Sequence, residues 1–406
     1  MRDHSNHITM TRHQAVAALM ERWEYMRRTE TLPVEQALGR VAAEDVTSQV
    51  TLPSWPTSNM DGVAVHFADF EGGAPDTANW QRGVDWQFCN TGIAMPEGFD
   101  TAIAIECVEL SENDTRIKLN HVPERAGEST SPVGSRLGAG DVLVRAGEPI
   151  TPVLQAVLSM GGHTHVQVVA RPRVAFIPTG NELVPTCANP PVGKNIETNA
   201  IMVCGKLAQW GAEPSRFPIV PDKPDLLLSA MRRAAAECDI VVMNAGSSKG
   251  SDDYTCELLE REGEVLCHQT DQGPGRHVSM SLLDGTPVVG ISGPPVGAEF
   301  TTDWFVKPFV DAYLGLPQVT PPVVQAVMRG GFTARVPRPM NLVRRVVVSR
   351  LADGTYEARP MSTGELPELR CCNAANGTVT VPKDSAGWND GDTLEVELRW
   401  PYRIPE

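Results

Sequence analysis

The segment Asp239–Thr255 reads DIVVMNAGSSKGSDDYT, in which an apolar run is followed by a turn rich in glycine and serine. The run DIVVMN has the length and the β-branched content of a buried strand. The turn carries one lysine, Lys249, and ends in paired aspartates. Because turns of this kind expose backbone N–H groups, they commonly hold an anion or a metal ion. The segment therefore predicts a buried strand that leads into a binding loop.

The same alternation of strands and helices extends from Arg173 to Gly315. Apolar runs typical of strands are VAFIP (174–178), FPIV (217–220), EVLCH (264–268) and TPVVGIS (286–292). Helical patterns lie between them, at 199–212, 222–238, 253–263 and 296–315. Strands separated by such helices predict a mainly parallel, three-layer α/β domain over residues 171–315. Asp222 is predicted as the N-cap of the second helix and Gly263 as the C-cap of the third.

The region before this domain has a mixed pattern. A helix is predicted at 12–26 and a second at 33–46, followed by short β-like runs over about 51–147 and by a helix at 151–162. The first helix would bury one face, made of Ala15, Leu19, Trp23 and Met26. We therefore expect residues 1–170 to form a helical region with an inserted β domain.

The region after the α/β domain begins with a proline-rich hinge, Leu316–Val323. Short β-like runs follow, RRVVVSRL, TYEARPM, TVTVPK and TLEVELRW. They predict a small β domain or barrel over residues 324–406. The predicted fold class is thus a multidomain α/β plus β protein.

The composition of the 406 residues excludes several classes of protein. The formal charge of −15 disfavours a nucleic-acid partner or an anionic membrane surface, since both require basic patches. The charged N-terminus resembles no secretory signal, and no apolar run is long enough to span a membrane, so we expect a cytoplasmic protein. The nine cysteines form no C-x-x-C pair and predict free thiols rather than a disulfide or zinc framework.

Three loops are predicted to leave the sheet at one edge, because ligands of open parallel sheets gather at the carboxyl ends of the strands. They are PTGNELV (178–184), NAGSSKGSDDY (244–254) and ISGPPVGAE (291–299). The segment TDQGPGRHVSM (270–280) adds Arg276 and His277. Glycine amides, hydroxyls and helix N-termini in these loops would suit a phosphate group.

The sequence lacks the motifs of several other nucleotide-binding and hydrolytic sites. ANPPVGKN lacks the first glycine and the final serine or threonine of a Walker loop, and no G-x-G-x-x-G follows a strand. Neither a G-x-S-x-G elbow nor an H-E-x-x-H helix is present. Gly246 and Gly250 could serve only to make a tight turn, and Asp252 or Asp253 could serve only as an N-cap. Structural and functional readings therefore both remain open for each residue alone.

The chain resembles the molybdopterin molybdenumtransferases, a family that includes bacterial MoeA and the E domain of gephyrin. Four ordered motifs carry the resemblance: SNMDGVAV (58–65), NTGIAMPEGFDTAIAIE (90–106), PTGNELV (178–184) and NAGSSKGSDDYT (244–255). The resemblance implies an elongated homodimer with its active site between subunits. It also implies insertion of molybdate, or tungstate, into adenylylated molybdopterin with release of AMP, assisted by a divalent cation such as Mg²⁺. A client molybdoenzyme is a further implied partner.

The resemblance also implies roles for individual residues. Asp253, Glu182 and Asp61 match catalytic positions, and carboxylates of Asp253, Glu182 and Asp222 would orient a metal ion, since hard divalent cations prefer oxygen ligands. Asp61 and Thr91 would approach from the partner subunit, and Glu106 matches a further motif position. The implied substrate-binding residues are Thr91, Gly246, Ser247, Ser248, Lys249, Gly275, Arg276, Ser292, Gly293 and Pro295.

The chain departs from the family pattern within the same loops. Gln269 and Gly273 stand where the family has lysines, and His277 replaces a proline. Ser292 and Pro294 are also substituted, Arg136 aligns with a family carboxylate, and Lys249 replaces an apolar residue. The loss of two lysines would weaken an anion site, whereas the added cations could supply its positive charge from other positions. Two hypotheses follow: a divergent molybdenumtransferase, or a molybdopterin or cofactor carrier or sensor without metal insertion.

Overall fold

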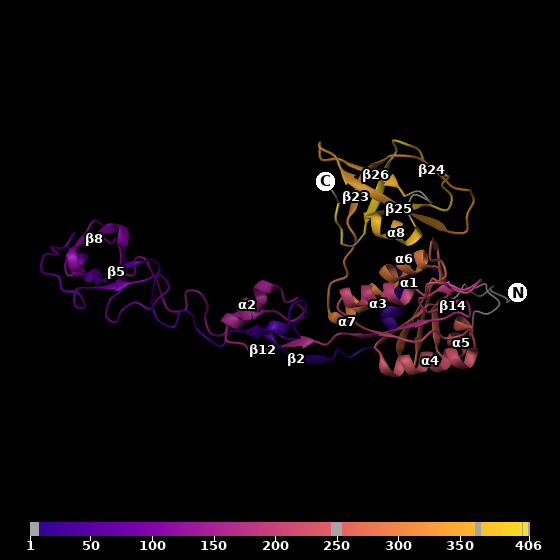
Figure 1. Ribbon diagram of the computed structural model, residues 1–406, viewed down its shortest axis with the longest axis horizontal. Coiled ribbons are helices and arrows are strands. Elements are labelled where there is room, and N and C mark those ends of the chain that lie inside the picture. Colours follow the sequence, from indigo (N-terminus) through magenta and orange to yellow (C-terminus); the bar gives the residue numbers. More distant parts are fainter. Residues whose placement is uncertain (1–7, 245–253, 362–366, 400, 405–406) are drawn as a thin grey trace. The chain divides into compact units, whose positions relative to one another are not determined.

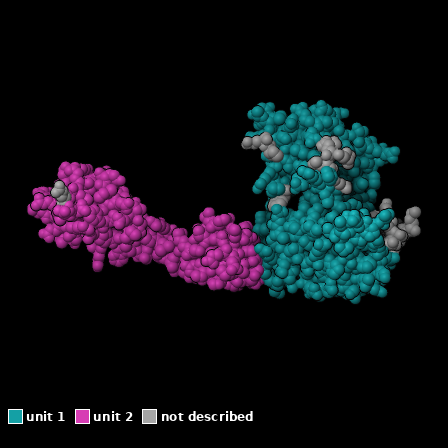
Figure 2. All heavy atoms as spheres, in the orientation of Figure 1, with its two compact units in different colours: residues 1–28, 170–406 teal, residues 29–169 magenta. Residues whose placement is uncertain are grey.

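The computed structural model of the protein describes residues 8–244, 254–361, 367–399 and 401–404. The chain forms two compact units (Figure 2). Unit 1 consists of Met1–Arg28 and Ala170–Glu406, and unit 2 consists of Thr29–Val169. Within the described ranges, none of the helices is both long and apolar enough to cross a membrane.

The centre of unit 1 is a six-stranded sheet with the order β16-β13-β17-β22-β21-β18. The first four strands run parallel, and β21 and β18 add an antiparallel edge. The strands are β13 (Arg173–Pro178), β16 (Glu213–Arg216), β17 (Ile240–Asn244), β18 (Glu264–Cys267), β21 (Ser279–Leu283) and β22 (Thr286–Ile291). The sheet is therefore mainly parallel, as the alternating pattern predicted.

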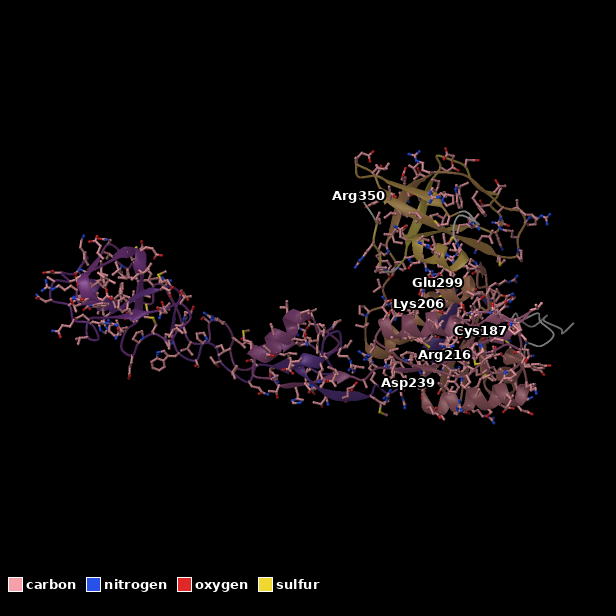
Figure 3. The ribbon with its side chains drawn as sticks, in the orientation of Figure 1. Cys187, Lys206, Arg216, Asp239, Glu299 and Arg350 are labelled. Atoms are coloured by element: carbon pink, nitrogen blue, oxygen red, sulfur yellow. The ribbon has the colours of Figure 1, made fainter. Side chains whose placement is uncertain are left out.

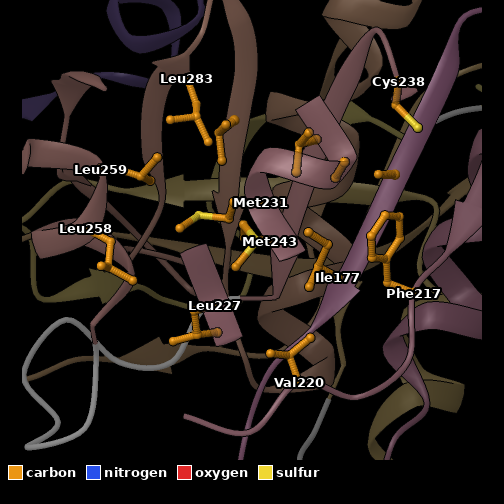
Figure 4. Packing of buried hydrophobic residues seen from close by; sticks show 14 residues of the cluster. Ile177, Phe217, Val220, Leu227, Met231, Cys238, Met243, Leu258, Leu259 and Leu283 are labelled. Carbon is orange, nitrogen blue, oxygen red and sulfur yellow. The ribbon is translucent and has the colours of Figure 1, made fainter. Parts of the chain in front are cut away.

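Helices cover both faces of this sheet (Figure 1). One face carries α1 (Arg12–Arg22), α3 (Asn199–Gln209) and α6 (Pro295–Phe305), and the other carries α4 (Pro224–Glu237) and α5 (Thr255–Glu262). Figure 4 shows the core on the second side, where Ile177 and Met243 of the sheet lie against Met231 of α4 and Leu258 of α5. Because side chains alternate along a strand, the apolar run Ile240–Met243 of β17 can bury side chains on both faces of the sheet.

The C-terminal part of unit 1 is a small closed β barrel. Its strands are β23 (Val323–Met328), β25 (Asn341–Arg350), β26 (Tyr356–Pro360), β27 (Gly377–Val381) and β29 (Thr393–Leu398). Pairing runs β25-β26-β23-β29-β27 and closes through β27 with β25. A short strand of the α/β domain, β20 (Gln272–Gly273), pairs in parallel with β25. The barrel is accompanied by α8 (Glu368–Ala374).

Unit 2 contains two large hydrophobic cores and a smaller cluster made of Ala64, Cys89, Met95 and Ala102. The first lies under α2 (Pro152–Met160) and the antiparallel pair β2 (Thr29–Pro33) and β12 (His165–Val169). The second lies in a three-stranded antiparallel sheet, β6 (Trp86–Cys89), β5 (Gly62–Val65) and β7 (Thr101–Ala104). The multidomain α/β plus β fold class is thus confirmed, and the domain bounds 1–170, 171–315 and 324–406 stay predictions.

Several predicted elements are wrong in their bounds. The first helix ends at Arg22, so Ala15, Leu19 and Trp23 are buried but Met26 is 87% exposed. The helix predicted at 33–46 does not form, and the chain makes only a 3₁₀ turn there, Val34–Gln36. Gly39 explains the difference, because its left-handed φ of 72° ends a helix.

Two more predictions within the α/β domain need correction. The second strand of the domain is β16 and not FPIV at 217–220; its polar sequence EPSR suits an edge strand that pairs with β13 alone. The helix predicted at 296–315 is two helices, α6 and α7 (Lys307–Leu314). Pro308 explains the break, since proline has no N–H and clashes with the preceding turn.

Candidate functional site

Three parallel strands of the α/β sheet end side by side. Pro178, the last residue of β13, pairs with Asn244, and Asn244 pairs with Ile291 of β22. The three loops predicted from sequence therefore leave the sheet at one edge. The middle loop, 245–253, lies outside the described residues, and with it lie the predicted site residues Gly246, Ser247, Ser248, Lys249 and Asp253 and the neighbouring Gly250 and Asp252.

The loop after β13 makes a tight turn at Gly180. Gly180 has φ +146°, and a Cβ atom on it would lie 2.6 Å from a carboxylate oxygen of Glu182. Asn181 donates its N–H to Asp222 Oδ2 at 3.0 Å, and the N–H of Asp222 donates to Asn181 Oδ1 at 3.2 Å. Asp222 is thus not the N-cap of α4, which is Lys223; it fixes the loop that carries Glu182. Gly263 is confirmed as the C-cap of α5.

The loop after β22 contacts the predicted fourth segment through two glycines. A Cβ atom on Gly297 would lie 2.2 Å from Ser292 Oγ, and one on Gly275 would lie 2.4 Å from Thr301 Cγ2. Gly275 also has a left-handed φ of 87°, which strongly favours glycine. Pro295 is the first residue of α6. The structure therefore brings Gly275, Ser292 and the start of α6 into contact.

The two positions at which the family has lysines serve other contacts in this chain. Gln269 donates to Thr9 Oγ1 at 2.8 Å, and Gly273 pairs with Leu342 of the barrel. A side chain at Gly273 would meet Met340, whose sulfur lies 2.9 Å from the Cβ position. The half-buried Arg276 remains. It keeps a buried guanidinium nitrogen, Nε, without a hydrogen-bond partner among the described residues, next to Gly275.

A buried hydrogen-bond chain links the three loops and was not predicted from sequence. Thr179 Oγ1 donates to the carbonyl oxygen of Asn244 at 2.8 Å. Asn199, the first residue of α3, donates from Nδ2 to Asn244 Oδ1 at 2.9 Å and to the carbonyl oxygen of Gly293 at 2.8 Å. The side chains are all more than 90% buried. The only trace in the sequence is Asn244, which replaces the serine of the family motif.

The predicted site residues of unit 2 form a small cluster of their own. Asp61 directly precedes β5, and its Oδ1 accepts the N–H of Thr91 at 2.9 Å. Its carbonyl oxygen accepts the N–H of Ile105, which precedes Glu106. Gly62 allows this close packing, since a Cβ atom there would lie 1.9 Å from the carbonyl oxygen of Ile103. The structure therefore brings Asp61 and Thr91 together on the surface of unit 2, where both are exposed.

A cavity of about 840 Å³ lies away from the strand ends, between α3, α6 and α8. Lys206 Nζ lies 2.5 Å from Asp303 Oδ1 and 3.1 Å from Glu299 Oε1, and Arg399 bonds both carboxylates. Figure 3 labels Lys206 and Glu299 of this cluster. Burial alone would raise the pKa of Glu299, but Arg399 and Lys206 together lower it; burial raises the pKa of Asp303. These charges neutralise one another, and the cluster joins the barrel to the α/β domain.

Cys89, Cys107, Cys187, Cys204, Cys238 and Cys267 carry free thiols, as the sequence predicted. Over the part of the chain that the structure describes, no three His, Cys, Asp or Glu side chains gather closely enough to hold a metal ion. The donor set nevertheless suits Mg²⁺, which usually takes only one or two carboxylates together with substrate phosphates. Asp222 lies against the loop that carries Glu182, because its Oδ2 accepts the N–H of Asn181.

Comparisons with known proteins agree with this architecture. Residues 10–162 match the family model "MoeA N-terminal region (domain I and II)", and residues 175–312 match "Probable molybdopterin binding domain". Molybdopterin molybdenumtransferases of Bacillus subtilis and Staphylococcus aureus are each 26% identical, over 93% and 91% of this chain and 93% and 90% of those chains.

A solved structure, the molybdopterin biosynthesis MoeA protein from Pyrococcus horikosii, shares the fold with a TM-score of 0.79. The two are 24% identical, and the match covers 96% of this chain and 99% of that one. The two family models lie in the order of the family and cover most of the chain, and the relatives match nearly from end to end. The chain therefore belongs to the MoeA family.

Proposed function

We propose that this protein acts in molybdenum cofactor biosynthesis, by inserting molybdate or tungstate into adenylylated molybdopterin with release of AMP. The observation that carries the proposal is the register of the three strand ends, Pro178, Asn244 and Ile291, which gathers glycine-rich loops at one edge. Membership of the MoeA family and the names of its full-length relatives support the same reaction. The edge suits a phosphorylated substrate, because loop amides and the N-terminus of α6 favour anions.

The residues divide by chemistry into two proposed groups. Glu182, Asp222 and Asp253 would hold a divalent cation, which when bound would neutralise charge on the phosphoanhydride. The anion would contact Arg276, Lys249 and the backbone of the loops, with substrate-binding roles for Gly246, Ser247, Ser248, Gly275, Ser292, Gly293 and Pro295. Arg276 is the cation that persists from the family motif, and Lys249 would replace the positive charge lost at Gln269 and Gly273.

The partners of the proposed reaction follow from the family. We propose a homodimer in which Asp61 and Thr91 of the partner subunit complete the site, since unit 2 exposes this hydrogen-bonded pair. Asp61 would have a catalytic role and Thr91 a substrate-binding role. The cytoplasm would be the site of the reaction, and a client molybdoenzyme would receive the cofactor.

The test is an AMP-release assay on purified full-length protein with adenylylated molybdopterin, molybdate or tungstate, and Mg²⁺. The wild type is expected to release AMP only when oxyanion and cation are both present, and Asp253→Asn is expected to abolish release while binding of the substrate persists. Binding of the substrate without turnover under either oxyanion would overturn the enzyme and leave a carrier. Complementation of a strain that lacks its molybdenumtransferase provides an independent check.

A further inference from the structure

Glu197 is a buried carboxylate beside the carboxyl end of β16, and the proposed reaction does not use it. It directly follows β15 (Asn195–Ile196) and is only 1% exposed. One carboxylate oxygen, Oε1, accepts the N–H of Ala200 at 2.7 Å, and the other, Oε2, accepts Nη2 of Arg216 at 3.0 Å. Removing a carboxylate from water is costly unless it is paired and hydrogen-bonded. Glu197 meets both conditions, and its two partners belong to different elements, α3 and β16.

The backbone around Glu197 holds the loop that carries Glu182. Strands β14 (Leu183–Val184) and β15 pair in parallel. The N–H of Asn195 donates to the carbonyl oxygen of Glu182 at 2.9 Å, and the N–H of Glu197 donates to that of Val184 at 2.9 Å. A displacement of Glu197 would therefore also move the backbone on which Glu182 lies.

The side chain of Glu197 fixes the first turn of α3. Thr198, the N-cap of this helix, makes no capping hydrogen bond from its side chain to the described residues, so Glu197 acts as the cap at the N–H of Ala200. Asn199 lies in the same turn, and its side chain joins the loops after β17 and β22 through the buried hydrogen-bond chain. Glu197 therefore acts on all three loops, on one through its backbone and on two through Asn199.

Arg216 connects this turn to the edge strand. It is the last residue of β16, and its side chain is 45% exposed, beside a pocket of about 510 Å³ between the loops that follow β13 and β16. Gly180 and Asn181, which precede Glu182 in the chain, form part of the wall of that pocket. The guanidinium offsets the buried charge of Glu197 from the solvent side. The ion pair thus lies between the edge strand and the Glu182 loop.

We propose that Glu197 is a positioning residue for the reaction: held by Arg216, it fixes the start of α3 and the Glu182 loop where the three strand ends can engage the substrate. The inference rests on the proposed function. Glu197 is too deeply buried to reach a ligand, so its effect would come through the groups that it holds. Because a displacement of about 1 Å can cost about 10²-fold in rate, the loss should appear in kcat.

The same sheet offers a matched ion pair away from the loops. Oδ2 of Asp239 accepts the N–H of Arg173 at 2.7 Å and Nη2 of Arg28 at 2.7 Å. The side chains of Asp239 and Arg28 are 17% and 42% exposed. Asp239 directly precedes β17, so this pair lies at the amino edge of the sheet. Figure 3 labels Arg216 and Asp239, one member of each pair. The Asp239 pair repeats the chemistry of Glu197 without its contacts to the loops.

The test compares Glu197→Gln with Asp239→Asn in the full chain. Each variant removes one charge, keeps an oxygen that accepts the backbone N–H, and leaves a partly exposed arginine to water. AMP release is measured over a range of adenylylated molybdopterin concentrations and divided by the folded fraction from urea unfolding. Glu197→Gln is expected to lower kcat by about tenfold or more and to change KM by less than about twofold. Asp239→Asn should match the wild type in both constants.

Two further measurements separate positioning from a general loss of structure. Arg216→Gln should lower kcat, but adding it to Glu197→Gln should cause little further loss, because the two partners of one interaction are not additive. Hydrogen–deuterium exchange requires no turnover. In Glu197→Gln it should be faster by about tenfold in segments 178–184 and 195–203, since a hydrogen bond to a charged group is commonly worth that factor. Asp239→Asn should leave exchange in both segments as it is in the wild type.

The positioning role would be wrong if Glu197→Gln kept the kcat of the wild type, or if Asp239→Asn lowered kcat as much. Strict additivity of Glu197→Gln and Arg216→Gln would also contradict it. Absence of AMP release from the wild type would instead overturn the proposed function, so the two failures are distinguishable. In that case the exchange measurement decides whether Glu197 holds the loops, and equal exchange in the wild type and Glu197→Gln would show that it does not.

Discussion

Charged side chains lie both at the carboxyl edge of the α/β sheet and at the junction of α6 with the C-terminal barrel. The two regions differ in how these charges are paired and how far they are buried. At the junction, Glu299 and Asp303 are each bonded by Lys206 and Arg399, and Glu299 is only 8% exposed. At the edge, Glu182 is exposed and Arg276 Nε has no partner among the described residues. The larger cavity lies at the junction and the smaller at the edge.

The difference shows that charge in a cavity is not sufficient to mark a binding site. Paired buried ions fix how two domains join, and breaking one pair is costly because a charge is left without compensation. Charges that lack a protein partner are instead free to meet a ligand. The junction should therefore respond to mutation in stability and the edge in activity.

The largest expected effect is on stability at the junction. Glu299→Ala removes a carboxylate that both Arg399 and Lys206 contact, and it should lower the free energy of unfolding by about 3 kcal/mol. Urea unfolding followed by circular dichroism measures the loss. The control Glu109→Ala breaks an exposed pair with Lys118 and should leave the midpoint unchanged. Equal effects of the two variants would contradict the assignment of the junction as structural.

At the edge, Glu182→Gln should act on the reaction and not on the fold. The amide keeps the shape of the side chain but not the charge proposed to hold a cation, so AMP release should fall by about 10²–10³-fold. The unfolding midpoint should match that of the wild type, because Glu182 is exposed. Glu237→Gln, an exposed position on α4, is the matched control. If Glu182→Gln lowered the free energy of unfolding and left kcat unchanged, Glu182 would be a structural residue and the proposed role in the reaction would be wrong.

The buried chain that links the loops should couple stability to activity. Asn199→Ala leaves Asn244 Oδ1 and the carbonyl oxygen of Gly293 without their donor, which should cost about 1–3 kcal/mol. Combining it with Asn244→Ala should cost less than the sum of the two single variants, as a double-mutant cycle of unfolding free energies can measure. The exposed Asn373→Ala provides the baseline. Strict additivity would argue against a shared network.

The smallest expected effect is a pH dependence near the junction. Burial raises the pKa of Asp311 on α7, against the opposing hydrogen bond and charge of Lys307. Because the folded pKa lies above the unfolded value of 3.8, this contribution is fully present below pH 3.8 and is lost as the pH rises through the folded pKa. Relative to the wild type, Asp311→Asn should therefore gain stability as the pH rises from 3.5. If the difference in stability between Asp311→Asn and the wild type did not change with pH, the titration of Asp311 would be excluded as its cause.

Much of the fold follows from local patterns, and the errors have physical causes. β17 and β22 were predicted because buried strands need continuous apolar runs. β16 was missed because its sequence EPSR has no apolar pattern, and only pairing with β13 makes it a strand. Propensity likewise favoured a helix at 33–46, where the left-handed Gly39 breaks it.

The features of the candidate site also divide into those that the local sequence predicted and those that it did not. The glycine-rich loops and their carboxylates were predicted, since turn residues and their order are local features. Asp222 was predicted as a helix cap, but its carboxylate reaches a loop 41 residues earlier in the chain. The pocket beside Arg216 combines residues 180–185 with 216–221, so no single stretch of sequence could reveal it.

By itself, the sequence determined the three-layer α/β domain, the terminal β domain and the set of glycine-rich loops, because periodicity and turn chemistry act over short distances. The tertiary structure decided which loops meet. Strand register aligned Pro178, Asn244 and Ile291, and Asn199 joined them by bonds across 45 and 94 residues. Such contacts depend on pairing between distant segments, which carries no local signal. Only the folded chain therefore reveals the pocket beside Arg216 and the paired ions.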